Sequence, residues 1–277
     1  MHLLKRYSVV LFVAILFTAC GEYQKVLNKG PVDKQYKMAS DYYESGEYRK
    51  AANLFEKVVP QYAGKPQLER IQYMYSDCLY QTKQYESAQY HFNRFIGNFP
   101  KSSKIEDATY MAAMSFYQLA PKSSLDQAYT QQAMIALQRF IDKYPESDKI
   151  AESNKYFDEL NDRIELKHFN IAKQYYHTEF YKAAIAAFDN FLEDYFGTSL
   201  KEDAIYYKFL AAHDLGMRSV LNKKEDRLKF AMSVYEKFKE TFPNSEKLKE
   251  LTNMNDNLTK ELQNTNEIIA KIKNNGL

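Results

Sequence analysis

Apolar residues recur along the chain with the spacing expected of helices that each bury one face. Five alanines start the pattern, and an apolar residue follows each of them four and seven positions later. The alanines are Ala51, Ala88, Ala133, Ala184 and Ala231; the residues four positions later are Phe55, Phe92, Leu137, Phe188 and Tyr235; and those seven positions later are Val58, Phe95, Phe140, Phe191 and Phe238. Offsets of zero, four and seven share one face of an α-helix, and a small residue there lets a neighbouring helix approach closely. The pattern therefore predicts five helices that each pack one face against a neighbour.

Prolines indicate where these helices end. Twelve positions after three of the alanines stand Pro100, Pro145 and Pro243. Proline lacks a backbone N–H and clashes with the preceding turn, so each of the three is expected to stop its helix. Ala63 and Phe196 occupy the same position after the other two alanines, so those helices need another stop.

The distances between the five helices predict what connects them. Successive alanines are 37, 45, 51 and 47 residues apart. The extra residues are expected in loops around 120–126 and 217–224, and in one long helix from Glu146 to Phe169, a stretch without proline or glycine. The tail at 244–277 has leucines at helical spacing and is expected to form a last helix that caps the open end.

A second pattern repeats upstream of each alanine. The segment YMYSDCLYQ at 73–81 aligns without gaps to YMAAMSFYQ at 110–118, and EDATY at 106–110 recurs as EDAIY at 202–206. Two helices per unit, with Ala-x3-Phe and a later Pro in the second, resemble the tetratricopeptide repeat. The resemblance implies an all-α fold: a right-handed superhelix of five tetratricopeptide-like helix pairs, with a long bridging helix and a C-terminal capping helix.

Two rows of aromatic residues run along the first helices of the pairs. The first row is Tyr36, Tyr73, Tyr110, Phe169 and Tyr206, and the second row, seven residues later, is Tyr43, Tyr80, Tyr117, Tyr176 and His213. Seven residues are nearly two turns, so both rows share one face, which lies on the concave side of tetratricopeptide superhelices. Either the rows pack between helices, or they line a peptide groove. Tyrosine in place of leucine favours a groove, because its hydroxyl needs water or a partner. The candidate groove residues are Tyr36, Tyr43, Tyr73, Tyr80, Tyr110 and Tyr117.

Composition and charge exclude several classes of function. The 277 residues include only 8 glycines and 7 prolines, which favours long helices and leaves few glycines for nucleotide-binding loops. The net charge is +2, and without Lys5 and Arg6, which lie in an expected leader, 36 basic residues face 36 acidic ones. Nucleic-acid binding needs a concentrated basic face, so we expect no nucleic-acid partner.

The sequence contains no motif that predicts catalysis, a metal or a cofactor. The motifs HExxH, GxGxxG, GxSxG and the P-loop are all absent. His168 and His177 are nine positions apart, which is unsuited to ligating one metal from one helix face. Cys78 is expected to be a buried helix residue rather than a reactive thiol. We therefore expect a protein that binds other proteins and is not an enzyme.

The first twenty residues have the pattern of a leader. A basic start, an apolar run and then Cys20 are typical of a secretory signal peptide. Phe17 to Cys20 resemble a bacterial lipobox, which implies cleavage after residue 19 and acyl chains on Cys20 that anchor the protein in a membrane. The alternative is an ordinary signal peptide with an incidental cysteine. Under the sorting rule for such lipoproteins, Gly21 in place of aspartate implies the outer membrane.

The chain as a whole resembles the BamD family, the lipoproteins of the β-barrel assembly machine of Gram-negative bacteria. The resemblance is most specific between 126 and 195, in the segments DQAYTQQA, FIDKYPES and IAKQYYHTEFYKAA. It implies a scaffold on the outer membrane, facing the periplasm, that helps outer-membrane proteins fold and insert. It also implies that repeats 1–3 contact unfolded outer-membrane proteins, whose last strand is apolar and aromatic on alternate residues. Repeats 4–5 would dock on the barrel-forming core subunit, beside other assembly lipoproteins.

This interpretation divides the chain into five parts. They are a signal peptide at 1–19, a lipidated tether at 20–32, repeats 1–3 at 33–145, the bridging helix with repeats 4–5 at 146–243, and the capping helix at 244–277. Three alternatives stay open: a pilotin for a secretin, a cell-division coordinator, and a SusD-like nutrient-binding lipoprotein. The last class is usually far longer and binds glycans with tryptophan, which this chain lacks.

Overall fold

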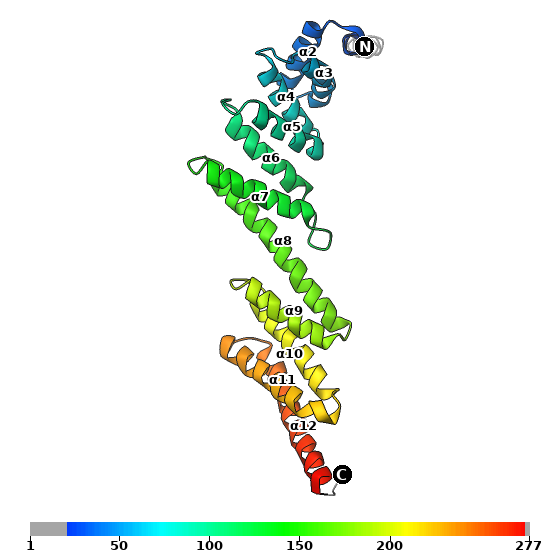
Figure 1. Ribbon diagram of the computed structural model, residues 1–277, viewed down its shortest axis with the longest axis vertical. Coiled ribbons are helices and arrows are strands. Elements are labelled where there is room, and N and C mark those ends of the chain that lie inside the picture. The colour runs from blue at the N-terminus through cyan, green and yellow to red at the C-terminus, as the bar shows by residue number, and fades with distance from the viewer. Residues whose placement is uncertain (1–20, 275–277) are drawn as a thin grey trace, which may run out of the picture. The chain divides into compact units, whose positions relative to one another are not determined.

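The computed structural model describes residues 21–274, and all regular secondary structure in that range is helical (Figure 1). The predicted all-α class is therefore confirmed. Contacts divide the chain into two compact units, residues 1–161 and 162–277, called here the N-terminal unit and the C-terminal unit. The division falls within helix α8, Ile150–His177. Cys20, the predicted lipid attachment site, lies outside the described residues.

Three helix pairs build the N-terminal unit. Residues 21–29 are helical and precede them. The pairs are α2 (Val32–Glu44) with α3 (Tyr48–Gln61), α4 (Leu68–Gln81) with α5 (Tyr85–Asn98), and α6 (Ile105–Leu119) with α7 (Ala128–Lys143). Each of these helices packs against the next along the chain. The first part of α8 completes the unit, because Leu160 belongs to the same buried cluster as Leu137 and Phe140.

The C-terminal unit begins with the second part of α8. It continues with α9 (Tyr181–Asp194), α10 (Lys201–Met217), α11 (Leu221–Thr241) and α12 (Leu248–Asn274). The helices from α9 to α12 pack in succession. The second part of α8 with α9 is called here the fourth pair, because Phe169 shares a buried cluster with Phe188 and Phe191, and α10 with α11 is called the fifth pair. Leu251 and Leu258 of α12 share a buried cluster with Phe238 of α11. The tail is therefore a packed helix, as its leucine spacing predicted.

The alanine pattern forms the centre of both units. All five alanines, and the apolar residues four and seven positions after them, have at most 4% of their surface exposed. Helices α5, α7 and α11 each end two residues before the predicted prolines Pro100, Pro145 and Pro243. Helix α9 ends at the equivalent Asp194, although Phe196 stands in the proline position. The apolar periodicity therefore gave the correct register, and the stop does not depend on proline alone.

One predicted loop is shorter than expected. The spacing placed a loop around 217–224, but α10 runs to Met217 and α11 begins at Leu221. The charged residues there belong to the first turns of α11 and are paired. Lys224 forms an ion pair with Glu261 of α12, and Lys229 lies 2.6 Å from Glu225 one turn before it. Such pairs stabilise a helical turn that looks loop-like in the sequence.

The turn within three of the pairs requires a left-handed residue. Gly46 has a φ of 78°, and Lys83 and Glu179 adopt φ values of 63° and 61° at the same position, five residues before the pattern alanine. Only glycine adopts this conformation without steric cost, and other residues lose about 1–2 kcal/mol. The second and fourth pairs therefore carry local strain that the first pair avoids.

Candidate functional site

The six candidate tyrosines lie on the first helices of the three pairs in the N-terminal unit. Tyr36 and Tyr43 are on α2, Tyr73 and Tyr80 on α4, and Tyr110 and Tyr117 on α6. Tyr110 is buried, and the other five are half-buried. Each ring is thus partly engaged within the unit, and the contacts differ between the two rows.

Rings of the first row pack into the core of their own helix pair. The ring centroid of Tyr73 lies 5.6 Å from that of Phe95 and 6.1 Å from that of Phe92. The centroid of Tyr110 lies 5.3 Å from that of Phe140. These phenylalanines are the residues four and seven positions after the pattern alanines. First-row rings therefore close the contact between the two helices of a pair.

Two rings of the second row, those of Tyr43 and Tyr80, pack against the start of the second helix. The centroid of Tyr43 lies 5.8 Å from that of Tyr48, and the centroid of Tyr80 lies 5.4 Å from that of Tyr85. Tyr48 and Tyr85 are the first residues of α3 and α5. Tyr43 and Tyr80 therefore support the tight turn that joins the helices of the first and second pairs, whereas the ring centroid of Tyr117 lies 4.4 Å from that of Tyr156 on α8.

Three of the six hydroxyl groups donate to carboxylates on the next first helix. The bonds run from Tyr43 to Asp77 at 2.7 Å, from Tyr110 to Glu152 at 2.7 Å, and from Tyr117 to Glu159 at 2.6 Å. Burial and the carboxylate of Glu152 raise the pKa of Tyr110. In turn, hydrogen bonds from Tyr110 and Tyr156 lower the pKa of Glu152. Each of the three hydroxyls has a partner within the chain, which explains tyrosine in place of leucine there.

The sequence analysis missed the loop that follows each second helix. The Oγ of Ser147 donates to Glu106 at 2.5 Å, and the Nζ of Lys149 lies 3.2 Å from Asp107. The same contacts recur in the C-terminal unit, where Ser245 bonds to Glu202 and Lys247 pairs with Asp203. The signal was present in the sequence as Pro-x-Ser-x-Lys at 145–149 and 243–247, and the same motif stands at 100–104. These contacts tie the loops after α7 and α11 to the first helices of the same pairs, α6 and α10.

The lysine of this loop also covers a first-row tyrosine. The Nζ atoms of Lys104, Lys149 and Lys247 lie 5.5, 5.9 and 5.4 Å from the ring centroids of Tyr73, Tyr110 and Tyr206. Ammonium groups within about 6 Å of an aromatic face are attracted to it. An aromatic residue, a lysine and a carboxylate therefore form a repeated cluster on the first-helix face.

A pocket of about 530 Å³ opens beside two of the candidate tyrosines. It lies between the end of α2, the first turns of α4 and the loop before α6. Its walls include Tyr43, Tyr73, Met74 and Phe95, and its rim carries charged residues. This volume falls within the usual range of about 300–1,000 Å³ for ligand pockets. The other four candidate tyrosines do not line it.

The rim of this pocket carries charges of both signs. Arg70 lies 3.3 Å from Glu44, and Lys104 lies 3.0 Å from Asp107. Because both cations have acidic partners, the rim does not form the cationic clamp that a chain-terminal carboxylate needs. Burial, followed by the nearby Asp107, raises the pKa of Tyr73 to about 12, so its hydroxyl is neutral at physiological pH. The arrangement suits an aromatic or aliphatic side chain of an extended peptide.

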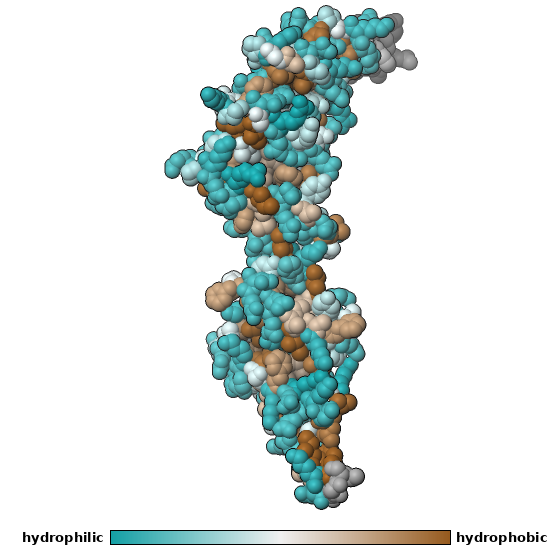
Figure 2. Space-filling view, in the orientation of Figure 1, coloured by the Kyte–Doolittle hydropathy of each residue, from teal (hydrophilic) through white to brown (hydrophobic). Residues whose placement is uncertain are grey.

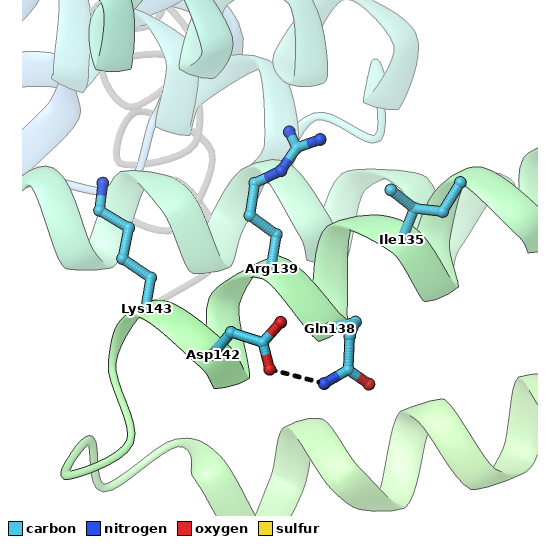
Figure 3. A pocket seen from close by; sticks show the side chains of 5 residues that line it. All are labelled: Ile135, Gln138, Arg139, Asp142 and Lys143. Carbon is cyan, nitrogen blue, oxygen red and sulfur yellow. Dashed lines mark hydrogen bonds between the residues drawn. The ribbon is translucent and has the colours of Figure 1, made fainter.

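A second depression lies over α7 and is more open (Figure 3). Ile135, Gln138, Arg139, Asp142 and Lys143 line it, and Gln138 donates to Asp142 at 2.8 Å. Figure 3 shows Arg139 and Lys143 on one side of the helix, with Gln138 and Asp142 on the other. None of the predicted site residues lines this depression.

Groups that could carry chemistry are engaged in packing. Between residues 21 and 274, no cluster of three or more His, Cys, Asp or Glu side chains could hold a metal ion. Cys78 is buried, as expected, and burial raises the pKa of its thiol. His91 packs its ring 4.7 Å from that of Tyr75, and burial lowers its pKa.

Among the helices of the described range, none combines the length and apolar character required to cross a bilayer.

Comparison with known proteins gives one family. Residues 28–228, which are 201 of the 277, match the sequence model of the YfiO family, described as outer membrane lipoproteins. The outer membrane protein assembly factor BamD of Rickettsia prowazekii (strain Madrid E) is 27% identical over 221 residues, covering 77% of this chain and 88% of the relative. Two solved structures of a Podosopora anserina protein with nearly identical TPR-like repeats of the kinesin light chain type are also similar. They are 14% and 13% identical, cover 76% and 74% of this chain and 96% and 95% of their own, and have TM-scores of 0.34 and 0.33. On the family match, the chain belongs to the YfiO family of outer membrane lipoproteins, the BamD type.

Proposed function

We propose that this protein is a scaffold subunit of the outer-membrane β-barrel assembly machinery. It helps outer-membrane proteins fold and insert by binding them, without catalysis. Membership of the YfiO family and a relative named as an assembly factor support this proposal. Acyl chains on Cys20 hold it on the outer membrane, facing the periplasm, because several chains together make a stable anchor.

The proposal includes a specific architecture. The helix pairs form a right-handed superhelix of five tetratricopeptide-like units, with repeats 1–3 at 33–145, the bridging helix and repeats 4–5 at 146–243, and the cap at 244–277. The recurrence of one buried alanine-centred face in five second helices supports this architecture. Repeats 4–5 dock on the barrel-forming core subunit, beside other assembly lipoproteins.

The substrate site lies in the N-terminal unit. The pocket beside Tyr43 and Tyr73 is the observation that carries this part of the proposal, because it combines aromatic walls with a mixed-charge rim. An unfolded outer-membrane protein would insert an aromatic side chain of its last strand here. Alternate residues of a strand point the same way, about 7 Å apart, so further side chains of the segment would follow the tyrosine face.

Peptide binding tests the substrate site. We expect a fluorescent peptide from the last strand of an outer-membrane barrel to bind the full chain, and Tyr73→Ala to weaken binding by about tenfold or more. Tyr42→Ala is the matched control, since Tyr42 is also half-buried but neither belongs to the tyrosine face nor lines the pocket. Equal binding by both variants, with equal loss of urea midpoint, would show that the tyrosine face serves packing alone.

The anchor is tested separately. Intact-mass analysis of protein extracted from membranes should find Cys20 as the first residue, carrying acyl chains. Cys20→Ala should leave the protein uncleaved at this position or release it from the membrane. A first residue other than 20, or a Cys20 without lipid, would overturn the anchoring proposal.

A further inference from the structure

One face of the first helix is covered in four of the five pairs. This face consists of the residues one position before, two positions after and six positions after the first-row aromatic. In α4 it is Gln72, Tyr75 and Leu79, with 4%, 8% and 4% of their surface exposed. In α6, Thr109 and Ala112 are buried, and in α10, Ile205 and Ala212 are buried.

The fourth pair differs at these same positions. The equivalent residues of α8 are His168, Ile171 and Tyr175, and all three are exposed. Ile171 and Tyr175 keep 44% and 41% of their surface accessible. Apolar residues also show as brown and tan surface among the teal where α8 and α9 lie (Figure 2). A face that is part of the core in the other pairs is therefore open here.

In the other pairs a helix covers this face. The helix of residues 21–29 covers α2, where Gln35 donates to the backbone oxygen of Val26 at 3.0 Å. At α6, Asn93 and Ile96 of the preceding α5 lie beside Thr109 and Ala112, and at α10, Lys208 of this face pairs with Asp189 of the preceding α9. Helix α4 packs between α3 and α5. The covering element is thus always one helix, whichever part of the chain supplies it.

Two pockets at the same corner of the repeat show the effect of the cover. At the third pair, Thr109, Ala112 and Phe116 of α6 meet Ala136, Arg139 and Lys143 of α7. Asn93 and Ile96 of the covering α5 line this corner too, and about 110 Å³ is left. At the fourth pair, the corner is lined by His168, Ile171, Ala187, Asn190, Phe191 and Asp194, from α8 and α9 alone, and about 240 Å³ is left.

We propose that this corner binds one amphipathic α-helix of a partner protein. It is called the helix slot and consists of His168, Ile171, Tyr175, Ala187, Asn190 and Asp194. The covered corner indicates the chemistry of the occupant, since α5 presents an aliphatic residue, Ile96, three positions after the polar Asn93. The occupant therefore places aliphatic side chains against Ile171 and Ala187.

Charge adds a second requirement for the occupant. Lys143 stands at the rim of the covered corner, but the helix slot has Asp194 at the equivalent position. The nearby His168 is engaged through its Nδ1, which lies 2.8 Å from the hydroxyl of Tyr195. An exposed carboxylate favours a cation, so the occupant carries a lysine or arginine beside Asp194. The proposal is independent of the peptide site in the N-terminal unit.

Photo-crosslinking in intact cells tests the helix slot. A photoreactive phenylalanine analogue replaces Tyr175 in the full, membrane-anchored chain, and the same analogue at Tyr90, which is 55% exposed on α5, is the control. We expect one dominant protein adduct from position 175 only. Its crosslinked peptide should be an amphipathic helical segment with aliphatic residues and a lysine or arginine. An adduct with a second copy of this chain, with lipid or with an extended segment, or no adduct above the control, would overturn the proposal.

Variants of neighbouring residues sharpen this test. Ala187→Glu adds bulk and charge inside the helix slot and should reduce the adduct by about tenfold. Ala186→Glu is its matched control, because Ala186 is exposed and does not line the slot. Asp194→Lys should also reduce the adduct, whereas Glu193→Lys should not, and both side chains are exposed, so folding is unaffected. Equal effects within each pair of variants would contradict the proposal.

Discussion

The third and fifth helix pairs carry a polar cluster where the fourth pair is apolar. The clusters are Asp107, Tyr110 and Lys149 in the third pair and Asp203, Tyr206 and Lys247 in the fifth; the fourth pair has Leu166, Phe169 and Leu200. In both polar clusters the lysine pairs with the aspartate and covers the tyrosine ring. In the fourth pair, Leu200 packs against the buried cluster of Phe169. All three positions change together, so each set works as one unit.

The comparison separates two roles of the first-row residue. Its ring closes the core of the pair in both settings, since Phe169 lies 5.8 Å from Phe188 as Tyr110 lies 5.3 Å from Phe140. Its hydroxyl matters only where a carboxylate and a lysine accompany it. A polar cluster that lacks some of its hydrogen-bond partners destabilises the fold more than a complete polar cluster or an apolar one does. Replacing tyrosine by phenylalanine in a polar cluster, or phenylalanine by tyrosine in the apolar one, should therefore lower the free energy of unfolding.

Removing the ring should have the largest effect. Tyr110→Ala and Phe169→Ala each delete a buried aromatic ring and should lower the free energy of unfolding by about 3–5 kcal/mol. Urea denaturation followed by circular dichroism measures this. Tyr90→Ala, at a site 55% exposed, is the control and should change little. A small effect at Tyr110 would mean that its ring is not part of the core.

Adding or removing the hydroxyl group of the first-row residue should have the next largest effect on stability. Tyr110→Phe removes a hydrogen bond to the charged Glu152 and should cost about 1.5–3 kcal/mol. Phe169→Tyr buries a hydroxyl beside Leu200 and should cost about 1–3 kcal/mol. Adding Leu200→Lys and Leu166→Asp to Phe169→Tyr rebuilds the polar cluster and should recover part of the loss. A neutral outcome for both single exchanges would show that the two settings are interchangeable.

Low pH should destabilise the polar cluster around Tyr110. The hydrogen bonds from Tyr110 and Tyr156 lower the pKa of Glu152 below its ordinary value of 4.5. A carboxyl group with a lowered folded-state pKa adds stability above its unfolded pKa, and this stability is lost as the pH falls through the folded pKa. The urea midpoint should therefore drop as the pH is lowered below about 4.5, and less steeply in Glu152→Gln. Identical pH profiles for the two proteins would contradict the assignment.

The smallest effect should come from the strained turns. Lys83 and Glu179 adopt the left-handed conformation that Gly46 supplies in the first pair. Lys83→Gly and Glu179→Gly relieve about 1–2 kcal/mol of strain but increase the entropy of the unfolded chain, for a net gain of about 0.5 kcal/mol. Gly46→Lys is the reverse control and should be destabilising. Thermal melts of the three variants measure the order of these effects.

The sequence predicted what local periodicity determines. Residues within one or two helical turns were enough to predict four features. These are the buried alanines, the helix ends at three prolines, the long helix α8 and the packed C-terminal helix. The same reasoning misjudged 217–224, because the partner of Lys224 is Glu261, on another helix. It also missed the open face of α8, because exposure of Ile171 depends on which helix lies beside it.

The candidate tyrosine site was predicted less completely. Both rows were found by their recurrence, but the acceptors of Tyr43 and Tyr110 stand 34 and 42 residues further along the chain. Contacts between residues so far apart in the sequence cannot be recognised from the periodicity of one helix. The pocket beside Tyr73 likewise combines four separate segments, from α2, α4, α5 and the loop before α6.

Partner identity tests the central claim most directly. The protein, carrying an affinity tag at its C-terminus, is purified from its own outer membranes in mild detergent, and the proteins that accompany it are identified by mass spectrometry. Our account predicts the barrel-forming core subunit of the assembly machine in near-stoichiometric amount, with other assembly lipoproteins. A secretin, a cell-division complex or a glycan transporter in its place would contradict the account.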